Sequence, residues 1–428
     1  MNIEKLHQLF LERNGISTDS RNCPANSLFF ALKGDNFNGN LFAQQALESG
    51  ASYAIVDQAD CVKDDKCILV DNVLESLQNL AAFHRKYLNI PIIGITGTNG
   101  KTTTKELIYT VLSKKYTTVC TKGNLNNHIG VPLTLLQMSK QTEIGIVEMG
   151  ANNLNEIAFL CNIARPDYGI ITNIGKAHLQ GFGSYEGVKK TKKELYDFIK
   201  QNNGTVFINS DDTVLTEIAQ GLKQIAYGTN SEQAFYSGTI HDENMLVSLH
   251  CTIGDETFEI QSQLFGTYNG YNILAAACIG FYFGVSTLEI KQAIEQYTPN
   301  NNRSQLHKTG SNTLFLDAYN ANPSSMFASV SNFAKLQIPD KILILGEMYE
   351  LGNDQIAEHK KIVDLLKTFP DLKSVYLVGN WGEKQGNFSY FENVNGLSEH
   401  FQNNKPLNCN ILIKGSRGVK LEQVITSL

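Results

Sequence analysis

A short glycine-rich segment combines residue types that bind phosphate groups. The segment GTNGKTT contains Gly97, Gly100, Lys101 and Thr102, and it lies between an apolar run and a helical pattern of apolar residues. Backbone amides of such glycines can close around a phosphate, the lysine can reach terminal phosphates, and the threonine hydroxyl can ligate Mg²⁺. Ile95 stands where the longer GxxxxGK[ST] pattern has its first glycine. The segment predicts an ATP site, and a glycine-rich turn that binds nothing is the alternative.

Two further polar residues follow strand-like runs of the same region. Glu148 ends the run EIGIVE, and His178 comes shortly after the run DYGIITN. Because ligands of a parallel sheet bind beyond the carboxyl ends of its strands, we expect both residues at the edge that carries the glycine-rich segment. Each of them alone could be an ordinary strand-end or loop side chain. Together with Thr102 they predict a Mg²⁺ site.

Lys192 differs from the other lysines of the segment VKKTKKELYDFI. The helical period places it on one stripe with Val188, Leu195 and Ile199, whereas its neighbouring lysines fall on the polar face. Burial on that stripe favours the neutral amine and makes its carbamylation by CO₂ conceivable. A structural role, in which the ammonium reaches solvent along its aliphatic stem, is the alternative.

A parallel sheet with crossover helices is needed to bring these residues together. Residues 1–88 hold short apolar runs (SLFFAL, SYAIVD, CILVDN) and a helical pattern that ends near Tyr87. In residues 89–300 strand-like runs alternate with helices, and VSLHCTIGDETFEIQSQL predicts an added antiparallel hairpin with a Gly-Asp turn. The alternation resumes in residues 301–428 with TLFLD, KILILG, SVYLVG and NILIKG. We predict an α/β fold of three domains: a small N-terminal α/β domain, a central P-loop ATPase-like parallel sheet with added antiparallel strands, and a C-terminal Rossmann-like doubly wound domain.

The composition restricts the partners and the compartment. The chain has 36 basic and 42 acidic residues and a net charge of −6, which argues against non-specific nucleic-acid binding. Its eight cysteines include no CxxC pair, so we expect reduced thiols in a cytoplasmic enzyme. The N-terminus lacks the unbroken apolar core of a signal peptide. The most apolar stretch, residues 273–285, is shorter than the roughly 20 residues that span a bilayer, so we expect no membrane segment.

Eight segments together resemble the Mur ligase family, and within it the MurF branch. They are GTNGKTT (97–103), GNLNNHIGVPLTLL (123–136), VEMGAN (147–152), TNIGKAHLQGFGS (172–184), GTYNGYNILAAA (266–277), LDAYNANPSSM (316–326), LGEMYELG (345–352) and IKGSRG (413–418). The resemblance implies that ATP phosphorylates the terminal carboxylate of a UDP-N-acetylmuramoyl-tripeptide, and that the amine of D-Ala-D-Ala attacks the acyl phosphate. It also implies two Mg²⁺ sites and an enzyme of peptidoglycan precursor synthesis; nothing in the sequence demands more than a monomer.

The resemblance assigns roles to individual residues around the nucleotide. Lys101, His178, Lys192 and Asn322 are the implied catalytic residues, and Lys192 matches the lysine that the family carries as a carbamate. The implied metal ligands are Thr102 and Glu148 for the first Mg²⁺ and His178 and Lys192 for the second. The implied nucleotide-binding residues are Gly97, Thr98, Asn99, Gly100, Lys101, Thr102, Thr103, Asn269, Asn272, Arg303 and Asp317, with Asn272 at the adenine, Asn269 supporting it, and Arg303 and Asp317 closing on the nucleotide from the third domain.

The resemblance also implies three groups of residues that bind the other substrates. Ser20, Arg21, Lys33 and Asn38 of the first domain are candidates for holding the UDP-sugar, and Asn126 and Asn127 for facing the sugar-peptide or the reacting groups. Asn320, Asn322, Lys414, Ser416 and Arg417 are candidates for the incoming dipeptide, whose carboxylate suits an arginine or lysine. The chain departs from the family pattern at His128, where an acidic residue is expected, and in the polar segment NNNRSQ around Arg303.

Two alternatives share part of these features. A sibling ligase that adds a single amino acid, either the third residue of the peptide or the glutamates of a folate, would have the same loop and metal site. A nucleotide-dependent switch without catalysis would need the loop, but neither Lys192 on an apolar face nor His178. The sequence leaves open whether the third residue of the tripeptide is diaminopimelate or lysine.

Overall fold

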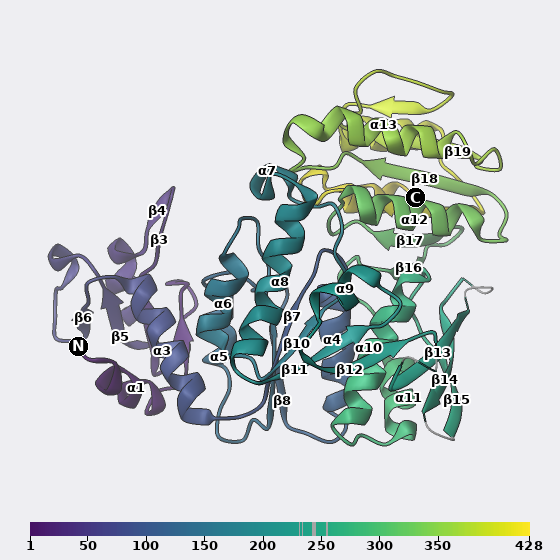
Figure 1. Ribbon diagram of the computed structural model, residues 1–428. Coiled ribbons are helices and arrows are strands. Elements are labelled where there is room, and N and C mark those ends of the chain that lie inside the picture. Colours follow the sequence, from purple (N-terminus) through teal and green to yellow (C-terminus); the bar gives the residue numbers. More distant parts are fainter. Residues whose placement is uncertain (231, 233, 242–244, 254–255) are drawn as a thin grey trace.

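The computed structural model consists of three α/β domains, each with its own main sheet (Figure 1). The structure describes residues 1–428 except 231, 233, 242–244 and 254–255. The predicted fold class is confirmed, while the bounds 1–88, 89–300 and 301–428 stay predictions. Among the described residues, we find no helix whose length and hydropathy would let it span a bilayer.

The first domain is a four-stranded parallel sheet in the order β1-β2-β5-β6, with a separate two-stranded hairpin, β3-β4. Its predicted apolar runs form β2, β5 and β6, and the predicted helix is α3. The strands are β1 (Ile16–Ser17), β2 (Ser27–Phe30), β3 (Lys33–Gly34), β4 (Phe37–Asn38), β5 (Ala51–Val56) and β6 (Cys67–Leu69), and the helices are α1 (Ile3–Leu11), α2 (Ala43–Glu48) and α3 (Val73–Leu88), with 3₁₀ turns η1 (Gly39–Phe42) and η2 (Ala59–Cys61).

The central domain is a nine-stranded sheet in the order β15-β14-β13-β12-β11-β10-β7-β9-β8. Its strands are β7 (Ile92–Thr96), β8 (Thr118–Cys120), β9 (Ile144–Glu148), β10 (Tyr168–Ile171), β11 (Thr205–Asn209), β12 (Lys223–Gly228), β13 (Tyr236–His241), β14 (Ser248–Ile253) and β15 (Glu256–Gln261). Its helices are α4 (Lys101–Leu112), α5 (Gly130–Leu135), α6 (Glu156–Ala164), α7 (Leu179–Phe182), α8 (Tyr185–Gln201), α9 (Thr213–Ile218), α10 (Tyr268–Tyr282) and α11 (Thr287–Gln296).

The predicted hairpin is confirmed, because β14 pairs antiparallel with β13 and with β15. Its predicted Gly-Asp turn, at 254–255, lies outside the described residues. The parallel part of the sheet extends further than the strand-like runs named in the sequence analysis, since β11, β12 and β13 also pair in parallel. These strands are short and their apolar residues do not alternate strictly, so a one-dimensional pattern identifies them poorly.

Helices cover both faces of the central sheet. One apolar cluster joins its strands to α6 and α8 and continues into α3 and the strands of the first domain. The other joins the strands to α4, α10 and α11. The first and central domains therefore share one continuous core, with α3 packed against α5 and α6.

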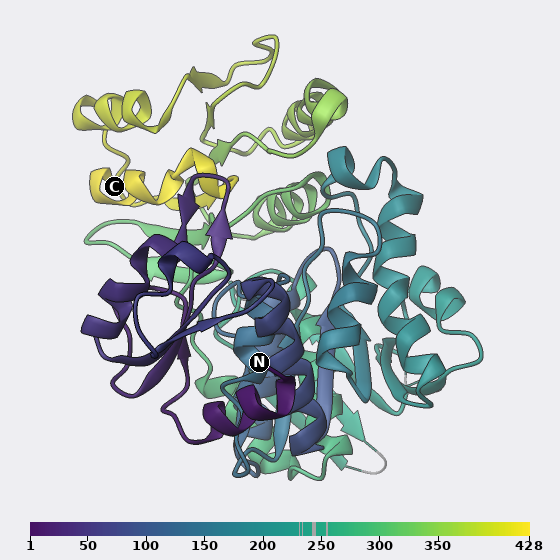
Figure 2. The same ribbon diagram turned by 90° about the vertical axis from the view of Figure 1, so that its left-hand side faces the viewer.

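The C-terminal domain is a six-stranded sheet in the order β16-β17-β21-β18-β19-β20, parallel except for the pair β16-β17. Helices α12 and α13 cover one face, and α14 with η5 covers the other, as expected of a doubly wound sheet. The elements are β16 (Gln305–Lys308), β17 (Thr313–Asp317), α12 (Pro323–Lys335), β18 (Lys341–Gly346), η3 (Gly352–Asp354), α13 (Gln355–Leu366), β19 (Ser374–Val378), β20 (Ser389–Phe391), α14 (Val394–Asn403), β21 (Asn410–Lys414), η4 (Arg417–Val419) and η5 (Leu421–Ser427). Figure 2 shows this domain above the other two.

Candidate active site

A cavity of about 720 Å³ lies between the carboxyl edge of the central sheet and the C-terminal domain. It brings together residues from both domains that are far apart in the sequence. Its lining includes the predicted site residues Thr98, Asn99, Gly100, Lys101, Thr102, Thr103, Asn126, Asn127, Glu148, His178, Asn269, Asn272, Arg303, Asp317, Asn320, Asn322 and Lys414.

The glycine-rich segment forms a tight loop between β7 and α4. Gly97 and Gly100 have φ of +142° and +78°, and a Cβ on Gly97 would collide with the side chain of Thr172. Helix α4 begins at Lys101, so its free backbone amides and positive dipole end face the cavity. The Lys101 ammonium donates to the carbonyl oxygens of Gly97 and Thr98 at 2.8 and 3.0 Å. Burial lowers the pKa of Lys101 to about 8, although Glu148 opposes that shift.

Glu148 ends β9 beside this loop, and its side chain is only 1% exposed. Its Oε1 accepts from the Nδ2 of Asn126 at 2.8 Å and from the hydroxyl of Thr102 at 3.3 Å. Its Oε2 is buried and has no hydrogen-bond partner among the described residues, and the Lys105 ammonium is 3.9 Å away. A buried carboxylate oxygen without a donor is costly unless a cation completes it.

The donors around Glu148 fit a Mg²⁺ ion. No group of three or more His, Cys, Asp or Glu that could hold a metal occurs in the described part of the chain. Mg²⁺ is usually held by one or two protein ligands together with phosphate oxygens and water, so Glu148 and Thr102 at the phosphate loop suit it. The free Oε2 of Glu148 is the observation that supports this fit.

Lys192 is buried on α8, as its position in the sequence predicted, with 3% relative exposure. Burial lowers its pKa to about 7, and the positive charge of Lys101 adds to the shift. Its ammonium lies 5.5 Å from the centre of the Phe182 ring. It is not among the residues that line the cavity, so it stands behind the lining, close enough to Lys101 to feel that charge.

His178 lines the cavity from the residue before α7 and has a left-handed backbone with φ of 49°. Its Nδ1 contacts the Oε2 of Glu350, which belongs to the C-terminal domain. This contact lowers the pKa of the Glu350 carboxyl. No motif in the sequence pairs these two residues.

The predicted adenine-side residues form one hydrogen-bonded group. Asn272 donates from Nδ2 to the Oδ1 of Asn269 at 2.8 Å and accepts from the hydroxyl of Thr104 at 3.0 Å. Asn269 donates from Nδ2 to the carbonyl of Phe265 at 2.7 Å and to the hydroxyl of Ser304 at 2.8 Å. Both Nδ2 hydrogens of Asn269 are thus used within the protein, while Asn272 keeps one Nδ2 hydrogen for a ligand.

Arg303 lies with its guanidinium carbon 3.7 Å from the centre of the Tyr319 ring. Its Nε is buried and has no hydrogen-bond partner in the described part of the chain. Arg417, which is exposed and outside the cavity lining, lies 5.4 Å from the same ring. A guanidinium stacked on an aromatic ring keeps its edge donors free for an anion.

Among the predicted dipeptide-binding residues, Lys414 and Asn322 line the cavity, whereas Ser416 does not. Lys414, which is 1% exposed, donates to the Oδ2 of Asp317 at 2.6 Å, so two residues predicted for different ligands pair with each other. Asn322 caps α12 and donates from Nδ2 to the Oδ1 of Asn99 at 2.8 Å, which joins the C-terminal domain to the phosphate loop. Ser416 is buried outside the cavity lining, and its hydroxyl accepts from the backbone amide of Tyr349 at 2.9 Å.

Asn126 and Asn127 approach the cavity from the segment before α5. Asn126 holds Glu148, whereas the Oδ1 of Asn127 accepts from the backbone amides of Ile129 and Gly130 at 3.1 and 2.9 Å. His128, the departure from the family pattern, also lines the cavity.

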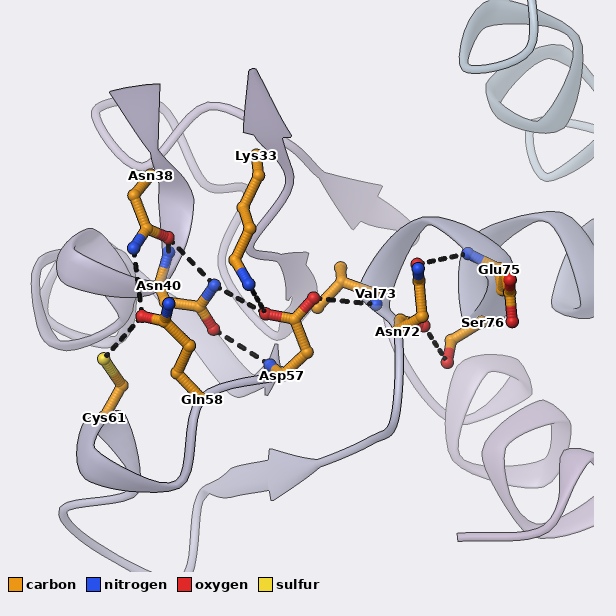
Figure 3. Close-up of polar contacts among 10 residues, drawn as sticks. All are labelled: Lys33, Asn38, Asn40, Asp57, Gln58, Cys61, Asn72, Val73, Glu75 and Ser76. Atoms are coloured by element: carbon orange, nitrogen blue, oxygen red, sulfur yellow. Dashed lines mark hydrogen bonds and ion pairs between the residues drawn. The ribbon is translucent and has the colours of Figure 1, made fainter. Parts of the chain in front are cut away.

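The four candidates of the first domain do not line this cavity. Lys33 pairs with Asp57 at 2.8 Å, and Asn38 donates to the Oε1 of Gln58 at 2.9 Å, within a polar network beside the β3-β4 hairpin (Figure 3). Arg21 pairs with Asp19 at 2.8 Å, and the hydroxyl of Ser20 donates to the Oε1 of Gln45 at 3.2 Å. Their roles toward a UDP-sugar stay predictions.

Several residues of the cavity were missed by the sequence analysis. Tyr319, Tyr268 and Glu156 line it, and the buried Lys105 stands beside Glu148. Tyr319 directly precedes Asn320, which was singled out, so its neighbourhood was a usable signal. Lys105 follows Lys101 by one helical turn, and that spacing could have placed it on the same face.

The matches to known proteins extend over the whole chain. Residues 95–280 match the Mur ligase middle domain, residues 302–404 the Mur ligase glutamate ligase domain, and residues 12–94 the Mur ligase family catalytic domain. The UDP-N-acetylmuramoyl-tripeptide--D-alanyl-D-alanine ligase of Bacillus subtilis is 34% identical over 432 residues, which cover 97% of this chain and 93% of that protein.

Solved structures agree with these matches. The crystal structure of MurF from Acinetobacter baumannii matches with a TM-score of 0.87 at 28% identity. The match covers 100% of this chain and 98% of that one. The MurF ligase of Thermotoga maritima, solved in complex with ADP, has a TM-score of 0.84 at 26% identity, over 98% of this chain and 97% of that one. Because sequence and fold agree from the first domain to the last, the chain belongs to the Mur ligase family and to its MurF branch.

Proposed function

We propose that the protein joins D-alanyl-D-alanine to UDP-N-acetylmuramoyl-tripeptide with consumption of ATP. The observation that carries the proposal is the cavity in which a phosphate loop and the free oxygen of Glu148 face residues of the C-terminal domain. Relatives that carry this activity in their names match nearly the full chain. The product is the UDP-linked pentapeptide precursor of peptidoglycan, and the enzyme is an ADP-forming peptide ligase.

The first half of the reaction activates a carboxylate. An oxygen of the tripeptide carboxylate attacks the γ-phosphorus of ATP, the bond to the β-phosphate oxygen breaks, and ADP leaves. Lys101 and the amides at the start of α4 hold the phosphates and offset their charge. When bound, Mg²⁺ neutralises phosphate charge, and Glu148 with Thr102 would hold it. We include in the proposal a second ion near His178 and a carbamate on Lys192.

The second half transfers the acyl group. The amine of the dipeptide attacks the acyl carbon, the bond from that carbon to the phosphate oxygen breaks, and the proton lost by the amine passes to the departing phosphate. Asn322 at the phosphate loop and Asn320 in the same segment of the cavity lining would position the dipeptide. Lys414 is occupied by Asp317, so we assign its charge to holding Asp317 in place for the nucleotide unless a ligand carboxylate displaces that contact. This is catalysis by positioning and charge.

The test is phosphate release from Mg-ATP with UDP-N-acetylmuramoyl-tripeptide and D-Ala-D-Ala, leaving out one component at a time. We expect release only with all components and a pentapeptide product by mass spectrometry. Lys192→Met should abolish release. Lys189→Met should not, because Lys189 of the same helix is partly exposed and pairs with Glu217. Phosphate release with a single amino acid in place of the dipeptide would instead identify the protein as a sibling ligase that adds one amino acid.

The diaminopimelate and lysine forms of the tripeptide should be compared in the same assay. We further propose that the protein is a cytoplasmic monomer that binds neither nucleic acid nor membrane. Sedimentation of the purified chain tests its oligomeric state.

A further inference from the structure

Glu350 extends from the C-terminal domain to His178 of the central domain. The contact joins Oε2 of Glu350 to Nδ1 of His178. It lies where α7 meets η3 of the C-terminal domain, at the upper end of the central domain in Figure 1. Neighbouring backbone contacts agree, since the amide of Gln180 lies 3.5 Å from the carbonyl oxygen of Glu350.

The loop that presents Glu350 is fixed within its own domain. The backbone amide of Met348 donates to Nε2 of the buried His359 at 2.9 Å, and the amide of Tyr349 donates to the hydroxyl of Ser416 at 2.9 Å. Glu350 itself has a left-handed backbone with φ of 63°, an unusual conformation for a glutamate. A rigid loop therefore holds this carboxylate at a defined place, and it arrives at His178 together with the domain.

The ring of His178 contacts both Glu350 and Phe182 and also borders the cavity. Its Nδ1 is buried against Oε2 of Glu350, although this contact lacks the geometry of an ordinary hydrogen bond and Nδ1 has no other partner among the described residues. The ring packs edge-on against Phe182 at 6.1 Å between centres, and His178 lines the cavity. Both His178 and Glu350 thus combine a strained backbone with a direct contact across the domain boundary, and strain of this kind clusters at functional sites.

The contact between His178 and Glu350 could either stabilise the domain arrangement or orient the imidazole ring, and the exposure of the two side chains decides between these roles. The side chains of His178 and Glu350 are 26% and 55% exposed, and exposed ion pairs contribute little to stability. The contact therefore contributes little to the stability of the domain arrangement. A carboxylate that accepts the Nδ1 proton of an imidazole, in contrast, sets which nitrogen carries the lone pair and where the ring points.

We propose that Glu350 is a positioning residue that orients His178 when the C-terminal domain closes, so that Nε2 faces the cavity as a metal ligand. The inference rests on the proposed function, because it takes His178 as a ligand of the second ion. It couples domain closure to completion of the metal site through one side chain. Catalysis would then start only when the domain that binds the dipeptide is in place.

The test is Mn²⁺ binding to the full-length protein with a non-hydrolysable ATP analogue, followed by electron paramagnetic resonance. We expect Glu350→Leu to weaken by about 10- to 100-fold the binding of the same ion that His178→Ala loses. Glu350→Gln keeps an acceptor oxygen and should restore much of that affinity. Glu358→Leu is the matched control, because it breaks another contact between these domains, with Lys176 at 3.3 Å, and should leave Mn²⁺ affinity unchanged.

Three results would overturn the inference. Glu350→Leu could bind Mn²⁺ as the wild type does, Glu358→Leu could lose as much affinity as Glu350→Leu, or His178→Ala could leave Mn²⁺ binding intact. Circular dichroism of each variant establishes that it is folded. Pentapeptide formation by the wild type is measured separately, so that failure of this inference is distinguishable from failure of the proposed function.

Discussion

The low pKa of Lys192 predicts that its amine reacts with CO₂ near neutral pH. In this reaction the amine nitrogen bonds to the carbon of CO₂ and loses a proton, so only the neutral form reacts. Burial moves the pKa of Lys192 from 10.5 to about 7. At pH 7.5 about three quarters of such an amine is neutral, compared with about 0.1% of an ordinary lysine, which is a difference of nearly a thousandfold.

The largest charge effect on Lys192 favours the product as well. The positive charge of Lys101 repels a protonated Lys192 but attracts a carbamate, and the carboxylates of Glu194 and Glu156 act in the opposite sense. Because the pKa is lowered, the neutral amine is present above pH 7 and is lost as the pH falls through 7. At a fixed concentration of dissolved CO₂ we therefore expect the carbamate to rise steeply with pH below 7, where deprotonation of the amine and proton release by the reaction both favour it, and less steeply above 7.

The assay is ¹³C NMR of the protein in ¹³C-labelled bicarbonate from pH 6 to above pH 9. The N-terminal amine also reacts and gives its own carbamate resonance in every variant. A second carbamate resonance should be present in the wild type and in Lys189→Met, and absent in Lys192→Met. If Lys192→Met keeps both resonances, or if the second one appears only above pH 9, the argument from burial is refuted.

Three other perturbations test the nucleotide side of the cavity. Gly100→Ala places a methyl group 2.7 Å from an amide oxygen at a φ of +78°, so we expect at least about tenfold weaker binding of an ATP analogue by calorimetry, while Gly310→Ala, with nothing within 4 Å, should bind normally. Glu148→Gln should raise the Mg²⁺ concentration for half-maximal phosphate release by about tenfold or more, and an unchanged Mg²⁺ dependence would contradict its role. Tyr319→Leu removes the ring 3.7 Å from Arg303 and should raise the KM for ATP by roughly 3- to 30-fold, whereas Tyr319→Phe should not.

The local parts of the site could be predicted from the sequence. The phosphate loop needs only a strand, two glycines, a lysine and a helix in succession, and all of these are neighbours in the chain. The burial of Lys192 follows from the helical period and the apolar residues around it. The placement of Glu148 and His178 at one edge follows from the parallel direction of β7, β9 and β10.

Contacts between distant segments could not be predicted in this way. Lys414 and Asp317 were each expected to face a ligand, but β17 and β21 are adjacent parallel strands, and their register places the two residues side by side. Local patterns of apolar and polar residues do not show which strands become neighbours. The same reason explains why β11 and β12 were not recognised as extensions of the parallel sheet.

The sequence by itself determined the chemistry that this protein can perform, because phosphate binding, the metal-ligating carboxylate and the buried lysine depend on short-range patterns. Only the tertiary structure decided how these parts act together. It packs the first domain onto the central one through a shared core, and it brings Asn322 to the phosphate loop and Glu350 to His178 from a domain with cores of its own. Such contacts arise from the packing of whole elements, in which hundreds of weak interactions between residues far apart in the chain select one arrangement.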